Sequence, residues 1–138
     1  MADDRDGILD YLMSEMVQPT LGLSRPLVLR NYPCSQAALA KVSRDDPQCA
    51  ARFELFVNGI ELANGYDELS DVAELVERNR LVQEKRERLG RKPITEMPQA
   101  LLSSISECLP QCAGVALGVD RLHLLRVGGT SLDEVSLF

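Results

Sequence analysis

Three glutamates and an asparagine, Glu54, Glu61, Asn64 and Glu68, interrupt an otherwise apolar stretch of the chain. Side chains in a strand alternate between the two faces of a sheet, and a hairpin after the first strand returns Glu61 to the face that carries Glu54. Two neighbouring carboxylates repel each other unless a cation joins them. Mg2+ held by one or two carboxylates and completed by substrate phosphates is a common solution. Glu54 and Glu61 are therefore candidate metal ligands.

A cationic side chain near the end of the chain could complete such a site. Arg121 follows a small-residue strand that contains Gly114 and Gly118. Glycines allow a ligand to approach the backbone closely, and a guanidinium can bind a phosphate with two parallel hydrogen bonds. Each signal alone has a plainer interpretation, because an arginine at a helix start is commonly a surface ion pair and a strand carboxylate commonly faces solvent.

The first half of the chain must supply strands that position these acids. Apolar spacing predicts an amphipathic helix over Asp4–Val17 that ends at Pro19, followed by a short strand in Arg25–Pro33. Residues 34–50 are predicted to form a loop with one helical turn. Two antiparallel strands then surround Asn58-Gly59, the strongest hairpin signal in the sequence.

The second half adds helices and one more strand. Ser70 is predicted to cap a helix whose basic end is more typical of a solvated surface than of a phosphate site. That end carries Lys85, Arg86, Arg88 and Arg91. A second helix covers Met97–Pro110, and residues 112–129 contain a strand that runs into a helix. This order predicts an α+β fold, an antiparallel β-sheet flanked by helices, in a single domain over residues 1–138.

Composition excludes several functional classes. The 138 residues carry a formal charge of −6, which disfavours a general nucleic-acid binder, and three Phe, three Tyr and no Trp offer few stacking surfaces. The single histidine is not placed beside the cysteines as a zinc site requires. No apolar run is long enough to cross a bilayer. A cytoplasmic protein with reduced thiols is expected, without a membrane partner. The thiols are those of Cys34, Cys49, Cys108 and Cys112.

Two segments resemble a known family. RFELFVNGIELANGYDELSD and CAGVALGVDRL are similar to the second half of a class II aminoacyl-tRNA synthetase catalytic domain of the lysyl type, and the latter resembles the third signature motif of that class. YPCSQAALAKVS and DRDGILDYLMSEMVQPTLG are similar to segments of the same family in the same order. The resemblance is closest to the lysyl-tRNA synthetase paralogues that attach β-lysine to elongation factor P, and it covers nearly the whole chain.

The resemblance implies a reaction and a set of ligands. It implies ATP-dependent adenylation of lysine or β-lysine with Mg2+, followed by transfer to a protein acceptor, elongation factor P, rather than to tRNA. At the nucleotide end, Glu54 and Glu61 would hold ATP through the metal and Arg121 would contact the terminal phosphate as the catalytic cation.

The resemblance also implies a pocket for the amino acid. Glu68 would accept a hydrogen bond from the side-chain ammonium of the substrate, and a buried ammonium does need such a charged acceptor. The other residues implied to line the pocket are Asn64, Tyr66, Gly114, Ala116 and Gly118.

One residue departs from the lysyl-tRNA synthetase pattern. That family usually has glycine in the middle of G-x-G-x-G-x-x-R, where this chain has Ala116, and the paralogues also carry alanine there. One methyl group in a close pocket changes selectivity by about 1–3 kcal/mol. We therefore expect a preference for the β-amino isomer over α-lysine.

Two other motifs of the family have no counterpart in the sequence. They are the first motif, which forms the dimer interface, and the second, whose arginine binds the α-phosphate. The chain is thus expected to be the C-terminal portion of a catalytic core, inactive by itself, that forms a homodimer or associates with the missing N-terminal part. The alternative is a non-catalytic synthetase-like remnant that binds a nucleotide, an amino acid or a protein partner.

Overall fold

The fold is built on an antiparallel sheet of four strands in the order β1-β2-β3-β4. The computed structural model describes residues 4–95 and 97–136. The strands are β1 (Leu27–Pro33), β2 (Cys49–Val57), β3 (Ile60–Asp67) and β4 (Ala113–Leu117). Each strand is antiparallel to its neighbour, so the predicted antiparallel sheet is confirmed.

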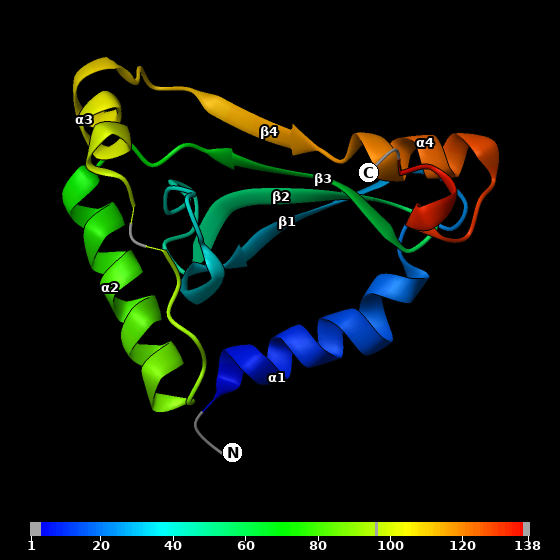
Figure 1. The fold of residues 1–138 in the computed structure, drawn as a ribbon, viewed down its shortest axis with the longest axis horizontal. Helices are drawn as coiled ribbons and strands as arrows, with labels where there is room; N and C mark the ends of the chain where they lie inside the picture. The colour runs from blue at the N-terminus through cyan, green and yellow to red at the C-terminus, as the bar shows by residue number, and fades with distance from the viewer. Residues whose placement is uncertain (1–3, 96, 137–138) are drawn as a thin grey trace.

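Four helices lie around this sheet. They are α1 (Arg5–Leu12), α2 (Val72–Arg88), α3 (Gln99–Cys108) and α4 (Val119–Val127). Figure 1 shows α1 running beside the sheet, α2 and α3 standing at one end, and α4 continuing from β4 at the other end. An ion pair between Lys85 Nζ and Asp4 Oδ1, 2.9 Å long, joins the end of α2 to the start of α1. The α+β fold class is confirmed.

The β2–β3 hairpin has the predicted turn. Asn58 and Gly59 have φ angles of 51° and 74°, as the favoured two-residue hairpin turn requires at both central positions. The backbone N–H groups of these two residues donate to Gly22 O and Leu21 O, at 3.0 and 2.8 Å. The segment that follows α1 therefore holds the hairpin, and with it the start of β3.

A register shift between β1 and β2 changes the face to which the later residues of β1 point. Arg30 pairs with Phe53 but Tyr32 pairs with Ala50, so β2 has two residues between these pairs where β1 has only Asn31, whose φ is 63°. In a regular strand Arg30 and Tyr32 would share a face. The shift instead places Tyr32 on the face that carries Ala50 and Glu54.

A second irregularity lies between β2 and β3. Leu55 pairs with Ala63 whereas Phe56 pairs with Glu61, so Leu62 has no direct partner in β2. Phe56 and Glu54 belong to one face, so Glu61, opposite Phe56, lies on that face, and the shift brings Asn64 to it as well. The predicted return of Glu61 beside Glu54 is what the register shows.

The packed interior is small. Ala37, Ala40 and Ala50 form a buried cluster against which Tyr66 packs, and Phe56 is 1% exposed beneath the hairpin. Arg78 of α2 donates to Ala38 O at 2.9 Å and to Ala40 O at 2.8 Å. These bonds fix the loop between β1 and β2 over one end of β3.

Three predicted helix boundaries need correction. The prediction that Ser70 caps α2 is wrong, because the side chain of Asp71, the residue directly before the helix, accepts from Glu74 N at 3.0 Å. The helix predicted over Asp4–Val17 is regular only to Leu12 and widens into a single π turn over Met13–Val17. The helix predicted over Met97–Pro110 is shorter at both ends.

Two further observations concern the cysteines and the lengths of the helices. Cys34, Cys49, Cys108 and Cys112 are all free thiols. In the ranges 4–95 and 97–136, no helix has the length and apolar character that a bilayer-spanning segment needs.

Candidate functional site

Most of the predicted site residues lie on one face of the sheet, in rows that cross the strands. Glu54 of β2 is opposite Asn64 of β3, which is opposite Ala116 of β4. The next row contains Arg52, Tyr66 and Gly114 in the same three strands. Residues directly opposite each other in antiparallel strands point to the same side, so these rows form one surface.

Glu54 is the most enclosed acid on this surface. Its side chain is buried, forms an ion pair with Arg52 through Oε1, and accepts a hydrogen bond from the Tyr32 hydroxyl through Oε2 at 2.6 Å. Burial and the hydrogen bond to Glu54 raise the pKa of Tyr32, so the hydroxyl keeps its proton and acts as a donor. A buried carboxylate needs hydrogen-bond donors, and Arg52 and Tyr32 supply one to each oxygen of Glu54.

Arg52 joins several parts of the site. Its guanidinium carbon lies 4.4 Å from the ring centroid of Tyr32 and 6.0 Å from that of Tyr66. It also donates to Gln36 O at 2.7 Å. The sequence analysis missed both Arg52 and Tyr32. For Arg52 a signal existed, since a residue two positions before Glu54 in a strand must share its face.

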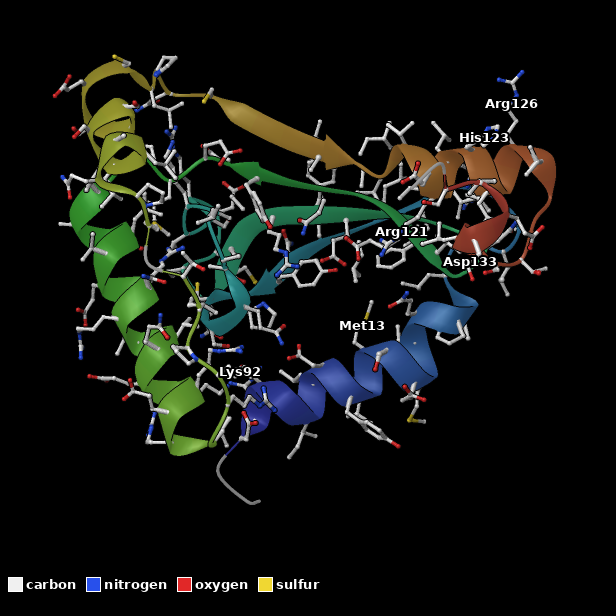
Figure 2. The ribbon with its side chains drawn as sticks, viewed as in Figure 1. Met13, Lys92, Arg121, His123, Arg126 and Asp133 are labelled. Carbon is white, nitrogen blue, oxygen red and sulfur yellow. The ribbon has the colours of Figure 1, made fainter. Side chains whose placement is uncertain are left out.

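Glu61 and Arg121 form the other end of the surface. Arg121 Nη1 donates to the backbone oxygen of Glu61 at 2.9 Å and lies 3.8 Å from Glu61 Oε2. Burial, followed by the negative charge of Glu54, raises the pKa of Glu61, and Arg121 opposes this shift. Figure 2 shows His123 and Arg126 extending away from the sheet. Of the Arg121, His123 and Arg126 side chains of α4, the one that contacts a predicted acid is Arg121, which binds Glu61.

Two buried polar atoms on this surface have no hydrogen-bond partner among the described residues. They are Asn64 Oδ1, an acceptor, and Arg52 Nε, a donor. Buried polar atoms in folded proteins are nearly always satisfied, by protein or by a bound molecule. Asn64 Oδ1 is therefore available to a ligand that donates a hydrogen bond.

Glu68 lies at the far end of β3, next to Gly114. A β-carbon built on Gly114 would be 2.2 Å from Glu68 Oε1, well inside contact distance. The backbone of Glu68 is held by a hydrogen bond from its N–H to Cys112 O, 3.0 Å long. The carboxylate thus occupies space that only glycine leaves free.

Unlike Gly114, Gly118 has room for a β-carbon, and Ala116 is exposed. A β-carbon on Gly118 would make only ordinary contacts, the shortest 3.4 Å to Arg121 Cδ, so space does not require glycine there. Gly118 N donates to Leu62 O at 2.8 Å and begins α4. Ala116 is exposed and directly opposite Asn64, so its methyl group lies beside the unsatisfied amide.

The acids at the Arg121 end match a particular kind of metal site. Among the described residues no group of three or more His, Cys, Asp and Glu could enclose an ion. The two carboxylates of Glu54 and Glu61 instead match the pattern in which Mg2+ uses one or two protein oxygens and takes the rest from phosphates and water. The repulsion that raises the pKa of Glu61 is the kind that a cation relieves.

Comparison with known proteins gives one family and a consistent set of relatives. The family of class II tRNA synthetases (D, K and N) matches residues 16–138. Similar proteins are named elongation factor P (R)-β-lysine ligase in Mannheimia succiniciproducens, 41% identical over 136 residues, and in Histophilus somni, 43% identical over 136 residues. The ligase of that name in Sodalis glossinidius is 43% identical over 138 residues. These matches cover 99% of this chain and 42% of each relative, so the chain spans less than half the length of the curated relatives it matches.

Proposed function

Because the chain belongs to the family of class II tRNA synthetases (D, K and N), we propose that it forms the amino-acid and nucleotide surface of an ATP-dependent ligase. The amino acid is lysine or β-lysine, which is adenylated on its carboxyl group. The chain would represent the C-terminal portion of the catalytic core, and the remaining part of the core would contribute the other wall of the site.

One observation supports this proposal above the others. Glu68 and Glu61 lie at opposite ends of β3, on the face that also presents the unsatisfied oxygen of Asn64. An extended strand rises about 3.3 Å per residue, which places the backbones of the two acids, seven residues apart, about 23 Å from each other. This length accommodates an amino acid followed by a triphosphate, with an acceptor for an ammonium at one end and charged groups for phosphates at the other.

At the amino-acid end, the proposal assigns recognition to groups on β3. Glu68 accepts hydrogen bonds from the terminal ammonium of the substrate, and its position against Gly114 sets how far that ammonium can reach. Asn64 Oδ1 accepts from the substrate's other amino group, which would satisfy the atom that has no partner in the described residues. Tyr66 forms the wall of the amino-acid pocket between Glu68 and Asn64.

At the nucleotide end, the proposal assigns binding to three charged side chains. Glu54 and Glu61 hold Mg2+, which when bound neutralises charge on the phosphates of ATP. Arg121 contacts the terminal phosphate after leaving its contact with Glu61 Oε2, which at 3.8 Å is loose. In adenylation a carboxylate oxygen of the amino acid bonds to the α-phosphorus as the bond to pyrophosphate breaks. Here Arg121 would hold the departing group.

The molecule that receives the activated amino acid is proposed from the names of the relatives alone. All three of the proteins compared above carry a name in which elongation factor P receives (R)-β-lysine. We propose the same protein acceptor for this chain, with tRNA as the less favoured one.

Apolar side chains on β4 and α4 support association with a further part of the core. Val115, Leu117 and Val119 are 64%, 48% and 68% exposed, although they follow one another along a strand and into a helix. Exposed apolar patches commonly mark interfaces. In the proposed function this surface packs against the rest of the catalytic core, from the same or a second chain.

Calorimetry with Mg-ATP, lysine and β-lysine tests the proposed function. Heat is expected from Mg-ATP and, in its presence, from β-lysine. ATP–pyrophosphate exchange is then measured with the remaining part of the catalytic core added, because the chain is expected to be inactive by itself. Binding without exchange under that condition would leave a non-catalytic module. A folded chain that gives no heat with any of these ligands at millimolar concentration would contradict the proposal.

A further inference from the structure

Among the residues that the structure describes, the hydroxyl of Tyr32 makes one hydrogen bond, to Glu54. Tyr32 Oη donates to Glu54 Oε2 at 2.6 Å, while Arg52 binds the other oxygen of the same carboxylate. A carboxylate offers about four lone-pair sites. With one donor on each oxygen, the plane of the Glu54 carboxylate is fixed and lone pairs remain on both oxygens.

The backbone of β1 is distorted in the way that places Tyr32 there. Asn31 has a φ of 63°, a conformation that non-glycine residues seldom adopt, and the register shifts between Arg30 and Tyr32. Without this shift, Tyr32 would share the face of Arg30, away from Glu54. Bulges of this kind often re-aim a side chain beside a functional site.

The ring of Tyr32 is held on one side by Arg52. The guanidinium of Arg52 lies over it at 4.4 Å. On another side the ring borders an open apolar pocket that Leu9 and Met13 also line, and Figure 2 shows Met13 directed toward the sheet. The contact with Arg52 and the hydrogen bond to Glu54 together fix the position of the hydroxyl.

We propose that Tyr32 is a positioning residue for Glu54, and that with Arg52 it orients the carboxylate that binds a divalent cation. This inference rests on the proposed function, since it assumes that Glu54 is a metal ligand. Groups that hydrogen-bond to metal ligands orient them, and their loss typically lowers metal affinity by about 10–100-fold.

Titration of Mn2+ into the chain, with free Mn2+ followed by electron paramagnetic resonance, tests the inference. Tyr32→Phe keeps the ring and its contact with Arg52 but removes the donor, and it is expected to weaken Mn2+ binding by about 10–100-fold. The matched control is Tyr11→Phe, because Tyr11 is 65% exposed. It is expected to bind Mn2+ as the unaltered chain does.

A double-variant comparison separates positioning from general structural damage. In a Glu54→Gln background, Tyr32→Phe is expected to cause no further loss of Mn2+ affinity, because its effect passes through that carboxylate. A further loss of the same size as in the unaltered chain would overturn the inference.

Near-ultraviolet absorption of the tyrosines gives an independent test of the role of Tyr32. The sequence has three tyrosines and no tryptophan. Saturating Mn2+ is expected to change the tyrosine absorption band, and the change is expected to vanish in Tyr32→Phe and persist in Tyr11→Phe. A change that persists in Tyr32→Phe, or equal Mn2+ affinity in Tyr32→Phe and the unaltered chain, would overturn the role of Tyr32 alone. An unaltered chain that binds no Mn2+ would overturn both this inference and the proposed metal site.

Discussion

The carboxylate of Glu68 occupies the space in which a β-carbon on Gly114 would lie, with 2.2 Å between Glu68 Oε1 and that position. Glu68 directly follows β3, and Gly114 lies in β4 opposite Tyr66. The glycine therefore determines where the proposed ammonium acceptor sits.

Gly114→Ala should displace Glu68 without unfolding the protein. The atom that must move is the end of a flexible side chain, so we expect the melting temperature to change little while affinity for β-lysine falls about tenfold or more. Calorimetric titration of β-lysine in the presence of Mg-ATP measures the loss. Because the effect passes through Glu68, the double variant Gly114→Ala, Glu68→Ala should bind no worse than Glu68→Ala alone. Additive losses would show that Gly114 acts in another way.

Gly65→Ala should damage the fold instead. A β-carbon there would lie 2.4 Å from Phe53 Cε1 and 2.9 Å from the backbone oxygen of Gly114. Crowding of this kind typically costs about 1–3 kcal/mol. The free energy of unfolding in urea should fall by that amount, and an unchanged value would mean that the ring of Phe53 moves aside freely.

The raised pKa of Glu61 predicts how stability depends on pH. A carboxyl whose pKa is higher in the folded state than in the unfolded state binds more protons when folded, in the range just above its ordinary pKa. Stability is therefore expected to fall as pH rises through that range. Glu61→Gln should remove this part of the pH dependence and raise the melting temperature near neutral pH by roughly 1–3 °C.

Thermal melts of the unaltered chain and Glu61→Gln between acidic and neutral pH measure the effect. The same substitution should weaken Mn2+ binding, because it removes a proposed ligand. A variant that is less stable at neutral pH would show that the contact with Arg121 outweighs the burial of the charge.

Ala116→Gly should change the preference between lysine isomers. The methyl group of Ala116 lies directly opposite Asn64, whose oxygen is the proposed acceptor for the substrate amino group. Removing it is expected to favour α-lysine over β-lysine by about 1–3 kcal/mol relative to the unaltered chain. Affinities for the two isomers, measured calorimetrically with Mg-ATP, give the ratio.

The matched control for that prediction is Ala113→Gly. Ala113 is in the same strand but three residues away, opposite Asp67 on the other face of the sheet. It should leave the isomer ratio unchanged. If Ala116→Gly and the unaltered chain have the same ratio of affinities for the two isomers, the hypothesis that this methyl group selects the isomer is wrong.

Much of the fold could be predicted because local signals agreed with one another. Asn58-Gly59 fixed the hairpin, alternating burial fixed the faces of β2, and together they placed Glu54 and Glu61 on one surface. The resemblance then connected β3 to β4, a contact between residues about 50 positions apart that no periodicity could supply.

The parts that were missed depend on departures from regular structure. Tyr32 reaches Glu54 only because the register between β1 and β2 shifts at Asn31, and nothing in the local sequence indicates where such a shift occurs. Arg52 could have been found from its spacing to Glu54, but an arginine in a strand is far more often a solvated side chain than a link between two tyrosines. Ser70 and Asp71 are both residue types that cap helices, so residue type alone does not tell which of the two begins α2.

The central claim is that Glu68 accepts the terminal ammonium of the amino acid. It is tested most directly by titrating β-lysine, and the analogue that lacks the terminal amino group, into the unaltered chain and Glu68→Gln with Mg-ATP present. A hydrogen bond to a charged group is worth about 1.5–3 kcal/mol. The account therefore predicts that Glu68→Gln binds β-lysine about 10–100-fold more weakly, and that both proteins bind the analogue alike. Equal affinity of the two proteins for β-lysine would contradict it.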